Sequence, residues 1–301
     1  MRTLQVTGQT LVALGLGGLA LLIGATSGCG DVNAALEKLS EARQIAADLR
    51  VQFTTAADAA NRAVMADTDE ASVAFAGEAR QAKEAVQKDI DALGPMLQSL
   101  SYADETRVLQ EFASRFTAYD ALDRRILDLA VENTNLKAQR LSFGPAQEAA
   151  DAFRDALGPF ANSVSARDAW QVRAVVATAV SAVREIQALE APHIAEADDA
   201  AMARLEKRMT AAEGAARSAL VTLATIGPKA SRAQLAAATA ALDKFMDVHA
   251  QILALSHRNT NVHSLALSLS QKPALATACE DRLRALDDAL DKRGYKVARW
   301  K

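Results

Sequence analysis

The sequence predicts an all-α protein built from two tandem up-down bundles of four helices that share, or are joined by, a long kinked helix. Three observations predict this fold class. Roughly a fifth of the residues are alanine, the strongest helix former. One sequence pattern occurs twice, about 126 residues apart. Apolar residues recur every seven positions, as in packed helices, while strand-like alternation is essentially missing.

Composition and motifs exclude several classes of function. The 34 Lys and Arg residues nearly balance the 37 Asp and Glu residues, so we expect no nucleic-acid partner. Two cysteines are too few for a disulfide scaffold, an iron–sulfur cluster or a Cys-rich zinc module. Neither a G-x-S-x-G elbow nor a phosphate-binding P-loop occurs. We therefore expect a protein that is not an enzyme and binds no cofactor.

Residues 1–28 are typical of an export signal. Arg2 is followed by an uncharged apolar run, Leu11 to Ile23, and by small residues before Cys29. The segment Ser27-Gly28-Cys29 resembles the bacterial lipobox, in which the cysteine is lipidated and becomes the mature N-terminus. The alternatives are an uncleaved N-terminal anchor and plain secretion. Each places the rest of the chain outside the cytoplasm, on the periplasmic side of a bacterial envelope, and the first two make the membrane a partner.

A duplication is the strongest internal signal. The segment from Ile126 to Asn135 aligns with the segment from Ile252 to Asn261, and each ends in Asn-Thr-Asn. A repeat of this length is typical of a duplicated domain rather than of a solenoid unit. We interpret residues 29–158 as the first bundle, 159–292 as the second, and 293–301 as a basic tail.

Proline, glycine and capping residues divide the body into helices. Thr68 and Asp104 are expected N-caps because their side chains can accept hydrogen bonds from free backbone N–H groups. The fourth helix contains Gly158-Pro159, which predicts a kink, and is the candidate for a helix shared by both bundles. The predicted helices are 33–66, 70–100, 104–142, 146–191, 196–226, 230–269 and 273–292.

A seven-residue spacing predicts the buried side of the third helix in each copy. In the first copy the series is Phe112, Tyr119, Ile126 and Asn133, with Leu122, Leu129, Leu136 and Phe143 on the neighbouring seam. In the second copy it is Phe245, Ile252 and Asn259, with Val248, Leu255, Val262 and Leu269. Both series are typical of helices in four-helix bundles.

Asn133 and Asn259 are the leading candidates for a functional site, because each places an amide on an otherwise apolar seam. One interpretation is that they pair across the core and fix the register of the helices. The other is that they line a ligand site between helices. Arg140, seven residues beyond Asn133, is able to bind a carboxylate bidentately in that case, or else extends to solvent at the bundle end.

The remaining polar candidates predict structural roles. No two of His193, His249, His257 and His263 have the i, i+4 spacing of paired metal ligands, so we expect solvated histidines and no metal site. Cys279 aligns with Phe153 and is expected to be a buried apolar residue, with a regulatory thiol as the alternative. The basic tail is expected either to contact an anionic membrane or to be a frayed helix end.

The segment from Phe116 to Leu141, with Tyr119-Asp-Ala-Leu-Asp-Arg-Arg-Ile-Leu-Asp-Leu and Asn133-Thr-Asn, resembles the third helix of the sensor domains of methyl-accepting chemotaxis receptors. The second Asn-Thr-Asn region, up to Asp281, is similar in style. The resemblance implies a four-helix bundle outside the inner membrane that binds small molecules or partner proteins. The HAMP and methylated signalling regions of that family are not found up to Lys301, so we expect no autonomous signalling across the membrane.

These observations lead to one functional expectation and one alternative. The expectation is a non-catalytic, membrane-anchored extracytoplasmic module that senses a small molecule or a partner protein in signal transduction. Its partner would be a receptor or another envelope protein, and uncovered apolar seams also favour a homo-oligomer. The alternative is a structural rod that scaffolds the bacterial envelope and has no small-molecule site.

Overall fold

A computed structural model of the protein describes residues 27–162, 169–227 and 231–298. No β-strand occurs within these ranges, and the prediction of an all-α protein is confirmed. A π-helical turn, η1 (Ser142–Ala146), joins α4 to α5. The α-helices are α1 (Ser27–Met65), α2 (Asp69–Ser99), α3 (Ala103–Glu132), α4 (Thr134–Leu141), α5 (Gln147–Asn162), α6 (Ala169–Ala195), α7 (Asp199–Ile226), α8 (Arg232–Arg258), α9 (Thr260–Ser270) and α10 (Lys272–Ala298).

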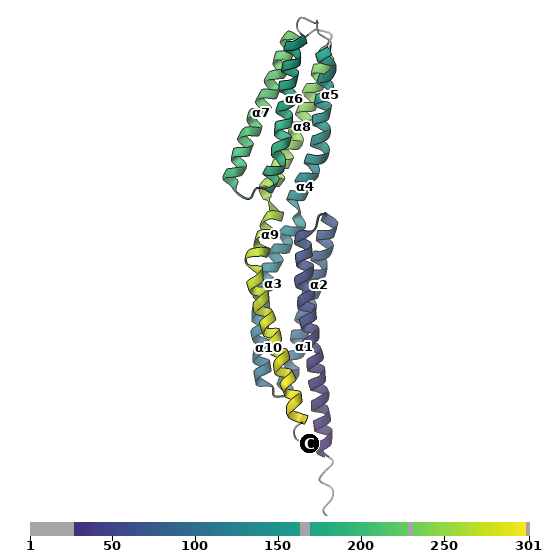
Figure 1. Cartoon of the computed structure of the whole chain (residues 1–301). Helices are drawn as coiled ribbons and strands as arrows, with labels where there is room; N and C mark the ends of the chain where they lie inside the picture. Colours follow the sequence, from purple (N-terminus) through teal and green to yellow (C-terminus); the bar gives the residue numbers. More distant parts are fainter. Residues whose placement is uncertain (1–26, 163–168, 228–230, 299–301) are drawn as a thin grey trace, which may run out of the picture.

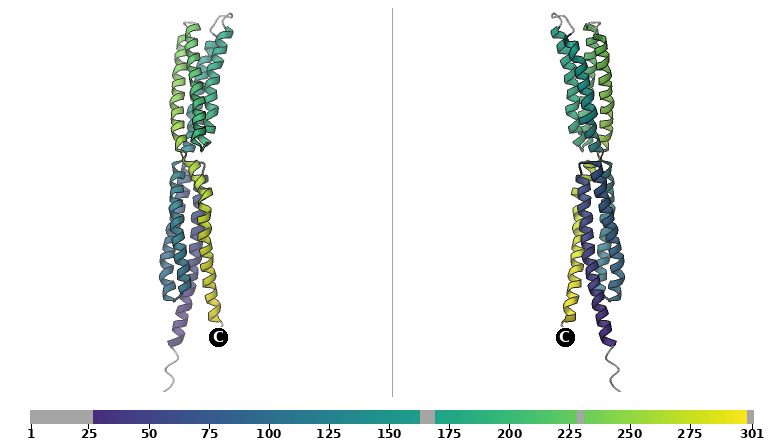
Figure 2. Two further views of the ribbon diagram at one scale, coloured as in Figure 1. Left: turned by 90° about the vertical axis from the view of Figure 1, so that its left-hand side faces the viewer. Right: turned by 90° about the vertical axis from the view of Figure 1, so that its right-hand side faces the viewer.

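The helices form two bundles stacked end to end in an elongated rod (Figures 1 and 2). The near bundle, which contains both ends of the described chain, consists of α1, α2, α3 and the consecutive helices α9 and α10. The far bundle consists of α4 with α5, together with α6, α7 and α8. The far bundle is therefore inserted into the near bundle between α3 and α9.

The predicted boundary between residues 158 and 159 does not coincide with this packing. The boundary falls inside α5, and both α4 and α5 pack mainly against far-bundle helices, α8 and α6. α10 follows the boundary but packs against α3 and α1 of the near bundle. The helices predicted over 104–142 and 230–269 end early, at Asn133 and Asn259, where the backbone turns left-handed. At these two points the chain crosses from one bundle to the other.

The helix predicted over 146–191 is also divided. α5 ends at Asn162, α6 begins at Ala169, and the two helices pack side by side in the far bundle. A single shared helix between the bundles is therefore replaced by two chain crossings. The other predicted helices agree in position with α1, α2, α7 and α10, although α1 and α10 extend several residues further.

Local signals explain where individual helices begin. The hydroxyl of Thr68 accepts a hydrogen bond from the N–H of Ala71 at 3.1 Å, which confirms the predicted cap of α2. Asp104 is not a cap, because α3 begins one residue earlier and Asp104 lies in its first turn. There its negative charge faces the positive end of the helix dipole. Pro145 lies inside η1, where the wider π-helical turn relieves the clash that a proline ring makes with the preceding turn.

The predicted seam is buried in both bundles. The residues of its main series, Phe112, Tyr119, Ile126 and Asn133 in one copy and Phe245, Ile252 and Asn259 in the other, are at most 2% exposed. Phe143 and Leu269 are instead 74% and 71% exposed. Each lies beyond a chain crossing, so the left-handed residue has reset the helical phase and the seven-residue series no longer follows one face.

Aromatic rings fill the near bundle, and small residues let its first two helices approach closely. Phe53 of α1 lies 6.0 Å from Phe112 and 5.1 Å from Tyr119 between ring centroids. Towards the junction the core changes to alanine on both α1 and α2, including Ala59, Ala63 and Ala76. Tight packing of such a core leaves little room for a cavity.

Cys279 is buried in the near-bundle core, as its alignment with Phe153 predicted. Burial raises the pKa of its thiol to about 12, because the thiolate would lose hydration. Little thiolate is then present at neutral pH, which leaves the side chain unreactive.

The sequence predicted an export signal with a lipidated Cys29 at the N-terminus and a basic tail at the C-terminus. Residues 1–26 and the side chain of Cys29 lie outside the described part, so the export signal and the lipidation stay predictions. Within the described residues, no helix combines the length and the apolar character needed to span a membrane. Of the basic tail, Arg293 is described: its guanidinium pairs with Glu105 at 2.7 Å and lies over the ring of Tyr102.

Candidate functional site: the junction between the two bundles

The junction is formed where the two Asn-Thr-Asn segments cross. Asn133 and Asn259 have φ angles of 53° and 50°, in the left-handed region. Asparagine tolerates this region better than most residues with a side chain, and a left-handed residue is a common way to end a helix. Thr134 and Thr260 then begin α4 and α9 in the opposite bundles.

Reciprocal hydrogen bonds hold the two segments together. The N–H of Thr134 donates to the hydroxyl of Thr260 at 3.2 Å, and the N–H of Thr260 donates to the hydroxyl of Thr134 at 3.1 Å. The N–H of Asn135 and that of Asn261 likewise donate to each other's side-chain oxygen, both at 3.1 Å. Each segment thereby caps the first turn of the helix that begins in the other.

The asparagine amides extend this network. Asn135 donates from Nδ2 to Oδ1 of Asn259 at 2.7 Å, and Asn261 donates to Oδ1 of Asn133 at 2.9 Å. Asn259 also donates to the backbone oxygen of Glu196 at 2.6 Å, just after α6. Nδ2 of Asn133 is buried without a hydrogen-bond partner. The structure thus places both predicted ligand residues at the crossing, bonded to the opposite segment, while their role towards a ligand stays a prediction.

Arg140 does not join that network. Its Nη1 lies 2.9 Å from Oδ2 of Asp69, the first residue of α2, and the Arg140 side chain is about half exposed. The pair links α4, which leads into the far bundle, to the near bundle. Arg140 thus braces the junction by an exposed salt bridge, which contributes little stability by itself.

Two histidines are buried on the far side of the crossing, where the sequence predicted solvated side chains. His193 is fully buried and His249 is 4% exposed. His249 shares the buried carboxylate of Glu190 with Ser142: its Nδ1 is 3.0 Å from Oε1, and the Ser142 hydroxyl donates to Oε2. The prediction was wrong for these two residues because each has a polar partner on another helix.

His193 belongs to a second polar cluster with Glu206 and His257, from α6, α7 and α8. Oε1 of Glu206 lies 2.8 Å from Nε2 of each histidine. The hydrogen bond from His193 and the proximity of His257 lower the pKa of Glu206, so its side chain is a carboxylate at neutral pH. Nitrogen and oxygen atoms of this kind are able to ligate a metal ion.

Sequence reasoning missed this cluster because its members come from three helices. The one local signal was the spacing Glu190-Ala-Pro-His193, which places a carboxylate and an imidazole on one helix face. In the structure these two residues do not contact a common partner: Glu190 is hydrogen-bonded to His249, and His193 is hydrogen-bonded to Glu206.

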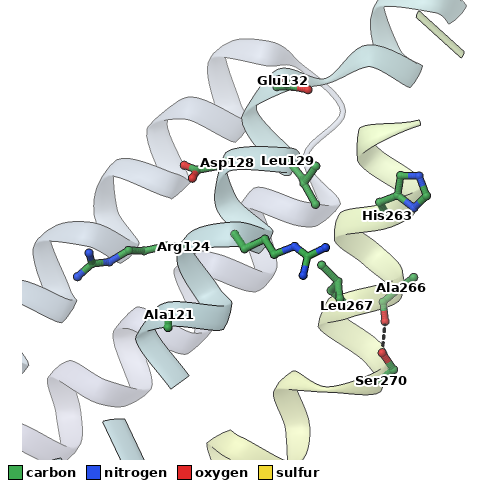
Figure 3. Close-up of a pocket in the computed structure, with 10 residues that line it drawn as sticks. Ala121, Arg124, Asp128, Leu129, Glu132, His263, Ala266, Leu267 and Ser270 are labelled. Atoms are coloured by element: carbon green, nitrogen blue, oxygen red, sulfur yellow. Dashed lines mark hydrogen bonds between the residues drawn. The ribbon is translucent and has the colours of Figure 1, made fainter. Parts of the chain in front are cut away.

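A groove of about 700 Å³ lies on the near-bundle side of the junction, between α3 and α9 (Figure 3). Leu129 and Leu267 extend into the space between the two helices. Charged side chains of α3, including Arg125 and Asp128, also line the groove, and α9 adds the polar side chains of His263 and Ser270. The groove therefore offers an apolar floor with charges of both signs at its edges.

Comparisons of the chain with protein-family models, with curated proteins and with solved structures gave no match.

Proposed function

We propose that the protein is a non-catalytic helical rod of the bacterial cell envelope, tethered to a membrane by its N-terminal segment, that presents its far bundle to a partner protein. The observation that carries this proposal is that the described chain begins and ends at the same end of the rod (Figures 1 and 2). A tether at the N-terminus leaves the inserted far bundle as the part most distant from the membrane.

Contacts between the terminal helices support a firm base for such a rod. The guanidinium of Arg43 donates to the backbone oxygens of Leu290 and Asp291 at 2.9 and 3.0 Å, which joins the first half of α1 to the second half of α10. α2 has 31 residues and α6 has 27, so the rise of a helix places the far tip roughly 85 Å from the base.

The far tip carries apolar side chains suited to a partner. Trp170, at the start of α6, is 73% exposed, and Val221, near the end of α7, is 69% exposed. Both helix ends lie at the far tip of the rod (Figure 1). Exposed tryptophan is enriched among the residues that dominate protein–protein binding.

The tether and the partner are tested in two steps in bacterial cells that produce the full chain. We expect the protein in the membrane fraction, with residues 1–28 removed and Cys29 acylated in its mass spectrum, and we expect Cys29→Ser to release it from membranes or leave it uncleaved.

A photo-crosslinking residue at position 170 is expected to give one discrete protein adduct. The same residue at position 51, where Val51 is 56% exposed on the near bundle, serves as the matched control.

Recovery of the unmodified chain from the cytoplasm would overturn the tether. Equal adducts from positions 170 and 51 would contradict presentation by the far tip.

The groove between α3 and α9 supports a second candidate, sensing of a small carboxylate. Arg125 lines the groove and has no ion-pair partner among the described side chains, and guanidinium groups bind carboxylates bidentately. Screening small carboxylates by thermal unfolding is expected to find one that raises Tm for the wild type but not for Arg125→Gln. Arg107→Gln, which changes an exposed arginine away from the groove, should respond as the wild type does. A set of carboxylates that leaves Tm unchanged would contradict this candidate.

A further inference from the structure

The cluster of His193, Glu206 and His257 has an arrangement that ion pairing alone does not require. Two imidazole nitrogens converge on one oxygen of one carboxylate, each at 2.8 Å. The rings meet edge to face, with centroids 5.5 Å apart and an interplanar angle of 87°. The three side chains come from the ends of α6 and α8 and from the second turn of α7, so the bundle packing itself brings them together.

The orientation of the His193 ring is set by Ser256. The Ser256 hydroxyl donates to the backbone oxygen of His193 at 2.9 Å, and Nδ1 of His193 lies 2.8 Å from the same hydroxyl. The ring is therefore held at Nδ1, and its Nε2 points into the cluster, 2.8 Å from Oε1 of Glu206. A histidine whose one ring nitrogen is held by a neighbour and whose other nitrogen points into the site is the usual arrangement of a metal ligand.

The exposure of the three side chains increases from His193 to His257. The His193 side chain is fully buried, Glu206 is 30% exposed and His257 is 49% exposed. The cluster therefore combines one fully buried group with two that reach solvent, through which a metal ion can exchange. Three protein ligands with an open position are typical of zinc sites that retain an exchangeable ligand.

We propose that His193, Glu206 and His257 bind a divalent transition metal such as Zn²⁺, through two imidazole nitrogens and one carboxylate oxygen, with the remaining position open to water or an exchangeable ligand. Bonds of about 2.0–2.2 Å in tetrahedral geometry place ligand atoms roughly 3.3 Å apart. The atoms of the cluster lie within 4.8 Å of one another, so small side-chain shifts satisfy this geometry. Nitrogen ligands select Zn²⁺ and its neighbours over Mg²⁺ or Ca²⁺.

The site belongs to the far bundle alone. At the 126-residue offset of the sequence pattern, its three positions correspond to Asp67, Arg80 and Val131, which do not form such a set. A metal ion here would clamp α6, α7 and α8 together beside Asn259, two residues after His257. The proposed site therefore stiffens the end of the far bundle that adjoins the crossing.

The test is titration of the full, tag-free chain, stripped with a chelator, with Zn²⁺ by calorimetry and with Co²⁺ by visible absorption. We expect one saturable site, with an absorption band for bound Co²⁺ that Zn²⁺ abolishes. His257→Ala and Glu206→Gln are each expected to weaken binding by at least about 100-fold, because loss of outer-shell partners alone costs 10–100-fold. His263→Ala removes another exposed histidine and should bind as the wild type does.

The half-exposed position of His257 makes its variant the decisive one, since the fold does not depend on burial of that ring. Absence of a saturable site in the wild type would overturn the proposal. Wild-type affinity in His257→Ala would overturn it as well. Circular dichroism of each variant verifies that lost binding does not come from lost helices.

Discussion

Replacing Asp123 by alanine is expected to lower the free energy of unfolding of the near bundle by about 3–5 kcal/mol, the cost of breaking a buried ion pair by removing one partner. The Asp123 side chain is fully buried on α3. Its two oxygens each lie 2.9 Å from a lysine nitrogen, that of Lys83 on α2 and that of Lys272 at the start of α10. Both lysine side chains are at most 6% exposed.

The two lysines are affected differently by this change. Lys83 retains an ion pair with Asp120 at 3.0 Å. Lys272 retains a hydrogen bond to Asn61 at 3.2 Å and the ring of Tyr119, but no other carboxylate within the described ion pairs. We therefore expect the loss to fall mainly on α10, which follows the returning helix α9 in the near bundle.

Chemical denaturation, with hydrogen exchange resolved along the chain, measures this effect. Asp123→Ala should lower the midpoint of unfolding and speed exchange in α10 more than in α6 or α7. Asp128→Ala, an exposed aspartate on the same helix, is the matched control and should change stability by less than about 0.5 kcal/mol. A loss below 1 kcal/mol for Asp123→Ala would show that the buried charges do not hold α10 in place.

The second large effect is expected at the crossing, where Asn259→Ala should lower the free energy of unfolding by at least about 3 kcal/mol. Alanine in the left-handed region costs about 1–2 kcal/mol. The amide of Asn135 and the backbone oxygen of Glu196 would each also lose a hydrogen bond of Asn259. Buried groups left without a partner cost about 1–3 kcal/mol each.

Glycine separates the two causes. Asn259→Gly removes the same hydrogen bonds but adopts a φ of 50° without strain, so it should be more stable than Asn259→Ala by about 1–2 kcal/mol. Asn133→Gly should cost less than Asn259→Gly, since Nδ2 of Asn133 has no partner to lose. Unfolding midpoints of the three variants test this order. Equal stability of the alanine and glycine variants at position 259 would contradict the role of the left-handed backbone.

The buried seams were predictable because helix periodicity is local. Residues seven apart share a helix face whichever helix covers that face, so Phe112, Ile126 and Ile252 were assigned to the core correctly. The same reasoning placed Asn133 and Asn259 on the seam. Their left-handed conformation had a local signal as well, since asparagine is a known helix terminator, but an unbroken heptad pattern on both sides favoured one continuous helix.

The candidate sites were less predictable. His193, Glu206 and His257 lie on three helices, and no spacing along the chain measures a distance between helices. The same limit explains why Arg140 was assigned a ligand or solvent role, when its carboxylate partner is Asp69 on another helix. The role of a polar side chain depends on its neighbours on other helices, and those neighbours are known only once the helices have packed.

Alanine content and heptad spacing were enough to establish an all-α protein with buried apolar seams, since helix propensity and side-chain periodicity act over a few residues. Which helix completes which bundle was decided in three dimensions. The apolar face of a helix can be buried equally well in the near bundle or in the far bundle. The sequence pattern of the helix is the same in both cases and does not show which bundle it joins. The left-handed turns at Asn133 and Asn259, and the hydrogen bonds that the crossing segments exchange, direct each following helix into the opposite bundle.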